Sequence, residues 1–379
     1  MRKGWEIKKL GDICDRASSN VSQNQLNNEV GEYPIFGASG LIKNVSFYHQ
    51  DKPYLSIVKD GSGVGRVTKM DAFTSIIGTL QYILPNEGID LDYLNYSLMS
   101  VDFKKYVAGA AIPHIYFKDY KNEPFLWMPL PEQQRIVSIL DEAFSSIEQA
   151  KENLQRNLQN AKELFQSELQ ATFLDKISGT NFEALDSLCE LIVDCEHKTA
   201  PTQATGYPSI RTPNIGKGVL ILDNVNRVSE ETYIEWTRRA IPQANDLILA
   251  REAPAGNVAV IPENLEVCLG QRTVLIRPKK DKFNSAYLAY LLLSKDVQEA
   301  FLSHSRGATV EHINMKDIRA FKIYNLSSIE TQQKIVQQLD KLSTETKRLE
   351  AMYQQKLDAL EELKKSVLQK AFSGELSEN

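Results

Sequence analysis

The sequence is 379 residues long, 42% hydrophobic and 25% charged, with a formal net charge of −5. Its length allows two or three domains, and its mildly acidic balance argues against a protein that coats nucleic acid nonspecifically, because such proteins are usually basic. Its four scattered cysteines do not form a disulfide framework pattern, and it has neither a long apolar run nor a signal-peptide core, so we expect a cytoplasmic protein without a membrane segment.

Residues 1–130 are predicted to form a first mixed domain, with short β-rich runs separated by Gly, Pro and Asn and an amphipathic helix at DYLNYSL (92–98). The segment DGSGVGR (60–66) hints at a phosphate-binding loop. However, it lacks the complete dinucleotide or GK[ST] pattern, and a β-type run follows where such a loop would open a helix. We therefore predict a strand–turn–strand hairpin over 54–67.

Residues 131–178 are predicted to form a long helix, because no Pro or Gly interrupts positions 132–173 and helix-forming residues dominate. Apolar residues follow a 4-3-4-3 stepping from Ile136 through Leu140 to Leu164, which is typical of a coiled coil. At about 1.5 Å per residue this rod is on the order of 60 Å long. The stepping places the polar Asn157 in the seam, where it either fixes the register or leaves the seam locally hydrated.

Residues 179–328 are predicted to form a second mixed domain, which contains two motifs that imitate metal sites. DCEHK (194–198), with Asp186 upstream, resembles the D…ExK arrangement of metal-dependent nucleases but is short. Cys189, Cys195 and His197 lack a second ligand pair at a zinc-like spacing, so we interpret the cysteines as ordinary thiols. Because no hydrolase, kinase or methyltransferase signature is present, the chain is predicted to be non-catalytic and to hold no metal.

The last segment, 329–379, repeats the first helix. At a constant offset of 199, residues 132–173 align with 331–372 without a gap and with 14 identities in 42 positions, and Lys356 takes the place of Asn157. The mixed domains repeat more faintly, as in AAIPHIYFKDY (110–120) and ATVEHINMKDI (308–318). The sequence thus predicts an α+β tandem duplication with an internal pseudo-two-fold repeat. Two long helices separate the mixed domains and pack as an antiparallel coiled coil, although a heterologous partner for either helix remains an alternative.

Both mixed domains are close to neutral, with 14 basic against 14 acidic side chains in 1–130 and 17 against 18 in 179–328, so each can still present one basic face. Cations and amides beside turn formers are candidate DNA contacts, because Arg, Asn and Gln pair with base edges and Lys with phosphate. For His114 and His312, which lie at equivalent positions, a framework hydrogen bond is the alternative. The candidates are Lys43, Asn44, Lys59, Arg66, Lys69, His114 and Lys118 in the first domain, and Arg211, Asn214, Lys217, Arg238, Arg239, Arg251, Gln271, Arg272, Arg306 and His312 in the second.

Several of these segments together resemble one known family. They are the helix openings PEQQRIVSILD and ETQQKIVQQLD, their endings LQATF and LQKAF, and the second-domain stretches DCEHKTAPTQATGYPSIRTPNIGKG, NDLILAREAPAGNVAVIP and VCLGQRTVLIRP. The whole chain resembles the specificity subunit of a Type I restriction–modification system, with YPIFGASG (33–40) as a weaker feature of the first domain. The resemblance implies two target-recognition domains, each of which reads one half of an asymmetric, bipartite sequence in double-stranded DNA.

The resemblance also implies partners for the helices. Two copies of a methyltransferase subunit would dock on them and supply S-adenosylmethionine and adenine methylation, and a restriction subunit that uses ATP with Mg²⁺ can join. No cofactor is expected on this chain itself. The implied docking and spacer residues are Gln133, Gln134, Ile136, Leu140, Leu164, Phe173, Gln332, Gln333, Ile335, Leu339, Leu363 and Phe372.

Two other classes of protein compete with this interpretation. A non-catalytic coiled-coil scaffold would share the helices but leave no sequence-selective footprint on DNA. A stand-alone nuclease would lose cleavage on Glu196→Ala. An adjacent reading frame for an adenine methyltransferase would discriminate between these classes.

Overall fold

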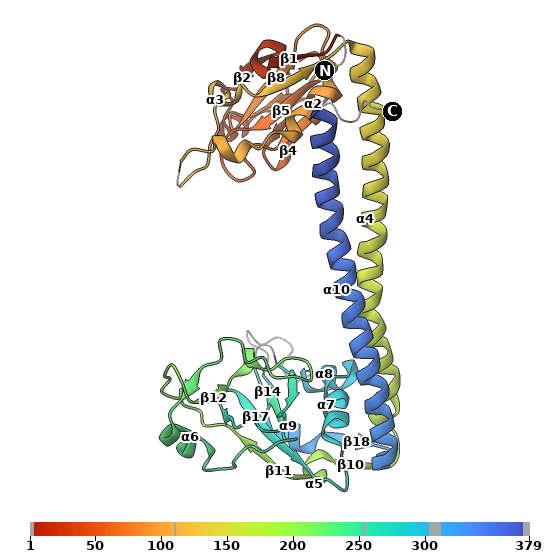
Figure 1. The fold of residues 1–379 in the computed structure, drawn as a ribbon. Helices are drawn as coiled ribbons and strands as arrows, with labels where there is room; N and C mark the ends of the chain where they lie inside the picture. Colours follow the sequence, from red (N-terminus) through yellow and green to blue (C-terminus); the bar gives the residue numbers. More distant parts are fainter. Residues whose placement is uncertain (1–3, 110, 253–254, 303–311, 374–379) are drawn as a thin grey trace. The chain divides into compact units, whose positions relative to one another are not determined.

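The computed structural model describes residues 4–109, 111–252, 255–302 and 312–373, and the chain divides into two compact units (Figure 1). Unit 1 comprises Met1–Gln155 with Gln354–Asn379, and unit 2 comprises Arg156–Tyr353. Each unit therefore contains one mixed domain and part of each long helix. The long helices are α4 (Leu130–Phe173) and α10 (Ile329–Ser373), as the sequence predicts.

The mixed domain of unit 1 has three sheets: β2-β8-β5-β6, which is antiparallel, β4-β3-β7, and the pair β1-β9. In the second of these, β3 runs antiparallel to β4 and parallel to β7. The elements are β1 (Glu6–Lys9), α1 (Leu10–Ile13), β2 (Cys14–Ser18), β3 (Tyr33–Gly37), β4 (Gly40–Val45), β5 (Tyr54–Val58), β6 (Val67–Met70), β7 (Ser75–Ile76), β8 (Leu80–Pro85), α2 (Leu91–Ser100), α3 (Phe117–Tyr120) and β9 (Pro124–Trp127).

The mixed domain of unit 2 follows the same plan, with the strand orders β11-β17-β14-β15, β13-β12-β16 and β10-β18. Again one neighbour pair in the three-stranded sheet, β12 with β16, is parallel. This strand-by-strand correspondence confirms the predicted duplication. The elements are β10 (Phe182–Ala184), α5 (Leu185–Leu188), β11 (Cys189–Asp194), β12 (Tyr207–Ile210), β13 (Arg227–Val228), α6 (Glu230–Thr237), β14 (Leu247–Ala250), β15 (Val258–Val260), β16 (Cys268–Leu269), β17 (Thr273–Pro278), α7 (Ser285–Leu293), α8 (Lys295–Leu302), α9 (Met315–Ala320) and β18 (Lys322–Tyr324).

Each domain is organised around one strand that is buried along its whole length. These strands, β5 (YLSIV) and β14 (LILA), are apolar except for Ser56, as expected of strands covered on both faces. The helices α2 and α7 belong to the corresponding cores and begin at equivalent polar caps. Asp90 accepts hydrogen bonds from the backbone N–H groups of α2, and Asn284 does so for α7.

The glycine-rich segment 60–66 joins β5 to β6 in an antiparallel hairpin, so the prediction of a turn is confirmed. Its three glycines have φ between 87° and 89°, a region that other residues rarely adopt. At Gly65 a Cβ atom would also lie 2.6 Å from the Cβ of Phe103. The glycines are therefore explained by backbone conformation and packing.

A buried glutamine attaches the first turn of each long helix to its own mixed domain. The side chain of Gln133 accepts from Asp90 N at 2.8 Å and donates to the carbonyls of Gly88 and Met128 at 2.9 and 2.7 Å. The side chain of Gln332 accepts from Asn284 N at 2.8 Å and donates to the carbonyls of Lys282 and Ser327. The repeated QQ dipeptide thus fixes how each helix leaves its domain.

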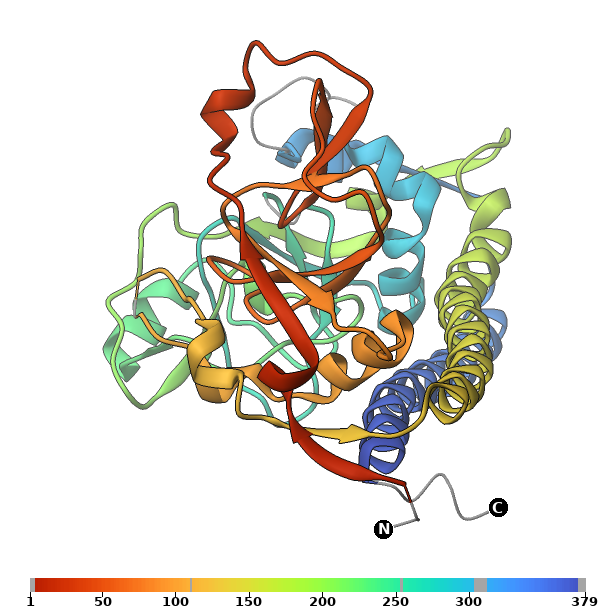
Figure 2. The same ribbon diagram turned by 90° about the horizontal axis from the view of Figure 1, so that it is seen from above.

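The long helices run side by side and antiparallel (Figures 1 and 2). In unit 1, Lys151 pairs with Glu361 at 2.6 Å and Glu148 with Lys364 at 3.2 Å, so residue numbers fall along one helix as they rise along the other. The predicted antiparallel pairing is confirmed. Within the described part of the chain, no helix has both the length and the apolar character needed to cross a membrane.

The helix seam differs from the predicted 4-3 stepping in its second half. Asn157 and Lys356 are exposed, and the neighbouring leucines, Leu158 and Leu357, take the inward positions. A strict seven-residue pattern drifts about 20° per heptad on a straight helix, which amounts to about 60° over the three heptads from Ile136. The predicted polar interruptions of the seam are therefore wrong, because the observed seam follows a period closer to that of a straight α-helix.

Candidate nucleic-acid interface

The duplication places a cation, a carboxylate and a histidine at the same corner of each domain. Lys59 and Asp60 follow β5, and Asp60 forms an isolated antiparallel bridge with His114. In unit 2, Arg251 and Glu252 follow β14, and Glu252 bridges to His312 in the same way. Because these residues follow fully buried central strands, the corner is held rigidly by the core.

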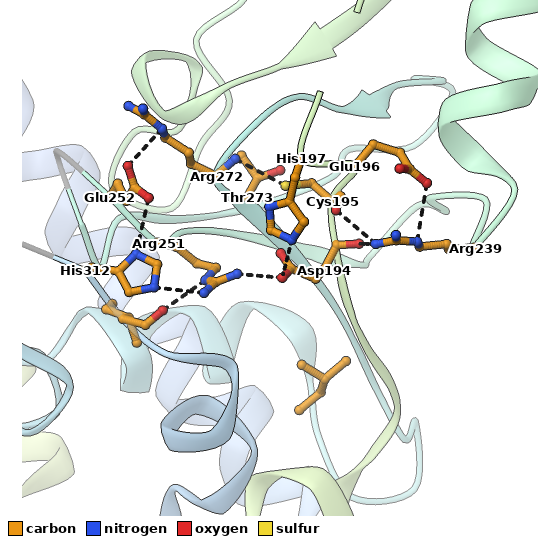
Figure 3. Close-up of polar contacts among 12 residues, drawn as sticks. Asp194, Cys195, Glu196, His197, Arg239, Arg251, Glu252, Arg272, Thr273 and His312 are labelled. Atoms are coloured by element: carbon orange, nitrogen blue, oxygen red, sulfur yellow. Dashed lines mark hydrogen bonds and ion pairs between the residues drawn. The ribbon is translucent and has the colours of Figure 1, made fainter. Parts of the chain in front are cut away.

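In unit 2 this corner is a closed network of hydrogen bonds around Arg251 (Figure 3). Its guanidinium donates to the carbonyl of Ile313 at 2.9 Å, to Asp194 at 2.6 Å and to Nε2 of His312 at 2.9 Å. Since a guanidinium only donates, Nε2 of His312 is an acceptor, and its Nδ1 carries the proton that faces Glu252 at 3.2 Å. Arg251 is 8% exposed. Its three guanidinium contacts all lie within the domain, which supports a structural role and leaves its role as a DNA contact a prediction.

Two adjacent arginines hold the loop that follows β11 in place. Arg238 contacts Oε1 of the buried Glu196 at 3.0 Å. Arg239 contacts the same oxygen at 3.3 Å and donates to the carbonyl of Cys195 at 3.0 Å (Figure 3). These contacts place the DCEHK segment in a structural role. More than half of the Arg238 side chain remains exposed, so it is available to a ligand.

Arg272 is a further exposed arginine near this corner. It has a left-handed backbone with φ of 66°, which is uncommon for a residue with a side chain. Its backbone N–H donates to the sulfur of Cys195 at 3.2 Å, and its guanidinium pairs with Glu252 at 2.8 Å while 61% of the side chain is exposed. The strained backbone and the two contacts aim a mostly solvated guanidinium outward.

The remaining candidates of the second domain are not gathered at this corner. Both ends of the Asn214 amide are used internally, by the N–H of Arg211 at 3.1 Å and the carbonyl of Ile221 at 3.2 Å, whereas the Arg211 side chain is exposed. Lys217 lines a cavity beside α4 and α10. Gln271 is half-buried, and Arg306 lies outside the described residues.

In unit 1 the structure gathers four cations around a cavity of about 580 Å³. Lys59, which pairs with Asp60 at 2.6 Å, and Lys118 were predicted as DNA contacts, whereas Arg16 and Lys121 were not among the candidates. Lys118 lies over the ring of Tyr116, which also lines the cavity, at 5.2 Å. Clustered cations beside an exposed aromatic ring suit phosphate contacts combined with base stacking.

Other predicted contacts of the first domain are engaged by their own chain. Lys43 donates to the carbonyl of Leu26 at 2.9 Å, Arg66 to the carbonyl of Ala38, and Lys69 pairs with Asp92 at 2.6 Å. His114 contacts the carbonyl of Ile112 at 3.2 Å, and Asn44 is exposed. The structure thus brings Lys59 and Lys118 to one cavity. The other predicted contacts do not line it: Lys43, Asn44, Arg66, Lys69 and His114.

The two imitations of metal sites have structural explanations. In the described residues no group of three or more His, Cys, Asp or Glu side chains could hold a metal ion. Burial raises the pKa of the Cys189 thiol to about 12 and raises that of Cys195, as expected of ordinary buried thiols. Asp186, the upstream acidic residue of the nuclease-like motif, forms an ion pair with Arg319, with 3.8 Å between Oδ1 and Nε.

The docking residues implied for the helices separate into a buried and an exposed group. Six of them are buried inside their own unit and are therefore spacer residues that a partner cannot reach: Gln133, Ile136, Leu140, Phe173, Gln332 and Leu339. Ile335 and Phe372 are half-buried, and Gln134 and Gln333 are exposed. Leu164 and Leu363, predicted in the seam, are instead 51% and 48% exposed, and they occupy equivalent positions of the repeat.

Comparisons with known proteins agree with this arrangement. The chain is 23% identical over 295 residues to the Type I restriction enzyme EcoBI specificity subunit of Escherichia coli, covering 71% of this chain and 62% of that relative, and so less than two-thirds of its length. The fold is similar to that of the HsdS subunit from Thermoanaerobacter tengcongensis, with a TM-score of 0.60, 16% identity and coverage of 99% and 98%.

A second solved chain, from a structure that describes complex assembly and conformational transition of the type I R-M system, has a TM-score of 0.75, 17% identity and 99% coverage of both chains. The model of the family described as the Type I restriction modification DNA specificity domain matches residues 2–156 and 181–361. These two matches cover one copy of the repeat each and, together, most of the sequence. The chain therefore belongs to the Type I restriction modification DNA specificity domain family.

Proposed function

We propose that this protein is the DNA-recognition subunit of a Type I restriction–modification complex. Each mixed domain reads one half of a bipartite, asymmetric target in double-stranded DNA. The observation that supports this most directly is the duplication of one sheet topology with different polar side chains at the equivalent corner of each copy. A shared framework with unlike surface residues suits a protein that reads two unlike half-sites.

The different side chains of the two corners support different contacts in the two domains. In the first, Arg16, Lys59, Lys118 and Lys121 supply phosphate contacts, and Tyr116 offers a stacking surface. In the second, the exposed Arg238 and Arg272 supply guanidinium groups, which are suited to bidentate pairing with guanine edges, and Arg211 offers another exposed guanidinium outside that corner. The buried Arg251 network holds the second corner in shape.

The long helices dock two copies of a methyltransferase subunit. The equivalent and exposed Leu164 and Leu363 give each unit an apolar contact at the same repeat position, which suits one partner species that binds twice. S-adenosylmethionine then belongs to that partner, and ATP with Mg²⁺ to a restriction subunit that can join the complex. This chain contributes recognition and assembly.

A selection experiment tests this function. The full-length chain, with and without its methyltransferase subunit, is used to enrich a random-sequence duplex library, and the bound and methylated sequences are read. We expect two fixed half-sites separated by a spacer of constant length, weak DNA binding by the chain alone and methylation only when the partner is present. Methylation by the purified chain alone, or a tight protein complex without any enriched sequence, would contradict the proposal; the second result would favour a scaffold.

A further inference from the structure

Unit 2 contains a cavity of about 550 Å³ between α4, α7 and α10 that the proposed DNA interface does not use. Phe165 of α4 and Tyr290 of α7 line it, together with Ser343 and Thr346 of α10. The exposed Val219 also lines it, so the cavity opens to the surface. Its volume is within the range of about 300–1,000 Å³ that is usual for ligand-binding pockets.

The equivalent position in unit 1 is filled by the chain itself. At the repeat offset of 199, Ser343 corresponds to Phe144 and Thr346 to Ile147, and both unit 1 residues are buried. The Phe144 ring lies 5.3 Å from the ring of Tyr96, whose hydroxyl donates to Asp141 just as that of Tyr290 donates to Asp340. The cavity of unit 2 therefore lies where the other copy places an aromatic side chain.

The opposite wall of the cavity differs in a complementary way. Phe165 corresponds to Lys364, which in unit 1 lies over the Phe144 ring at 5.1 Å. In unit 2 the Phe165 ring approaches Tyr290 to 6.1 Å from α4, and the small Ser343 side chain leaves the α10 side open. The space is thus bounded by aromatic rings that suit a further aromatic group in an edge-to-face arrangement.

The charges around the cavity indicate the chemistry of its occupant. Lys162, Lys217 and Lys347 line it, and none of them forms an ion pair within the part of the chain that the structure describes. Two carboxylates also line it: Asp340, which accepts the Tyr290 hydroxyl at 2.6 Å, and Glu350. Three cations against two carboxylates leave a positive excess at the cavity, which favours an occupant that is aromatic and flanked by acidic residues.

We infer that this cavity receives an aromatic side chain from an acidic segment of the methyltransferase subunit that docks on unit 2. The inference rests on the proposed function for the identity of the partner. The copy that docks on unit 1 meets Phe144 at the equivalent position and inserts no such side chain. Docking on the two units therefore differs in its anchoring contact although the exposed leucines are the same.

The substitution Ser343→Phe tests the inference by filling the cavity with the residue that unit 1 uses, and Ser343→Ala is the matched control. The number of methyltransferase copies bound to the full-length chain is counted by native mass spectrometry over a concentration series. Wild type and S343A should bind two copies. S343F should bind one copy normally and the second at least about 10-fold more weakly, which is the size of effect expected for a buried aromatic anchor.

The thermal transition of the free chain shows whether the new ring enters the cavity. We expect S343F to melt no lower than wild type, since the ring replaces empty space. If S343F melts lower than wild type, a double variant, Lys162→Glu with Lys347→Glu, tests the inference instead, because it reverses the charge of the cavity without filling it. Lys341→Glu, on the exposed surface of α10, is the control. The double variant should weaken the second copy by at least about 10-fold and K341E should not.

The outcomes separate this inference from the proposed function. Wild type that binds no methyltransferase contradicts the proposed function. Wild type that binds two copies, with S343F and the lysine variants also binding two at unchanged affinity, overturns the cavity inference alone. Wild-type chain that forms a dimer which S343F abolishes would also overturn it, because the occupant would then be a second copy of this protein.

Discussion

The glutamine pair that opens each long helix consists of one buried and one exposed residue. Gln133 and Gln332 are fully buried and make three hydrogen bonds each to the preceding domain, whereas Gln134 and Gln333 face solvent. Identical residues at adjacent positions therefore have unlike energetic roles, because burial makes an unpaired polar group costly.

Gln133→Ala should destabilise the protein strongly. The substitution leaves the N–H of Asp90 and the carbonyls of Gly88 and Met128 without their buried partner, and each unsatisfied group costs about 1–3 kcal/mol. Since three groups are affected, we expect a loss of about 3 kcal/mol or more in the free energy of unfolding, measured by urea denaturation. Gln134→Ala is the matched control and should change stability by less than about 0.5 kcal/mol. Equal effects of the two variants would contradict the structural role of Gln133.

The cations of the first domain should contribute to DNA affinity through phosphates. Lys118→Gln with Lys121→Gln should weaken binding of the selected target and of unrelated duplexes alike, and lower the slope of log affinity against log salt by about 1 for each contact removed. Fluorescence anisotropy of the methyltransferase complex at several salt concentrations measures both quantities. Lys104→Gln removes one exposed charge of the same domain outside the cavity and should leave the slope unchanged. An unchanged slope in the double variant would remove these lysines from the interface.

At the scale of single elements, the sequence predicts the existence of both long helices but misplaces part of their surface. The 4-3 stepping assigns Leu164 and Leu363 to the seam, and the structure exposes both. The prediction failed because a 3.5-residue period was extended along helices whose buried face follows a longer period. The shift changes the interpretation of these leucines from internal packing to an outward apolar contact.

The exposed leucines should therefore matter for assembly more than for stability. Leu164→Asp should weaken docking of one methyltransferase copy by about 10-fold or more, and Leu363→Asp should weaken docking of the other. Because both positions are about half exposed, the thermal transition of the free chain should change little. Analytical ultracentrifugation of mixtures gives the stoichiometry. Asn157→Asp, an exposed change on α4 without an apolar loss, serves as control. If the variants lose stability while docking stays intact, the two leucines serve helix packing and not docking.

At the scale of the whole molecule, the two long helices connect two mixed domains of the same topology within one chain. Since each helix is attached to its own domain by a buried glutamine and pairs antiparallel with the other, a change in helix length must be made in both helices to preserve their pairing. This gives a direct test of whether the helices set the distance between half-sites.

Seven residues inserted after Asn157, together with seven after Gln355, should lengthen the helix pair by about 10 Å. The selected target should then keep both half-site sequences, and the spacer between them should become longer by about 3 base pairs, since one turn of about 34–36 Å holds about 10 base pairs. The same library selection measures this. An altered half-site sequence with an unchanged spacer would contradict the role of the helices as a spacer.

The sequence by itself determines the duplication, both long helices, the hairpin at 54–67 and the family. These features rest on repetition and periodicity, which are properties of the linear chain. The alignment of the repeats also places Lys59 over Arg251 and Asp60 over Glu252, so the equivalent corners were available from the sequence.

Only the tertiary structure decides what each charged or apolar side chain does. Arg251 is a structural residue because Asp194 and His312, 57 and 61 positions away, surround it, and Glu196 meets Arg238 from a distance of 42 positions. Arg16 joins Lys118 in one cavity although the sequence separates them. Whether a cation remains free for a ligand depends on which distant carboxylates and carbonyls approach it and on how far water is excluded. Both are set by the packing of the folded chain rather than by local pattern.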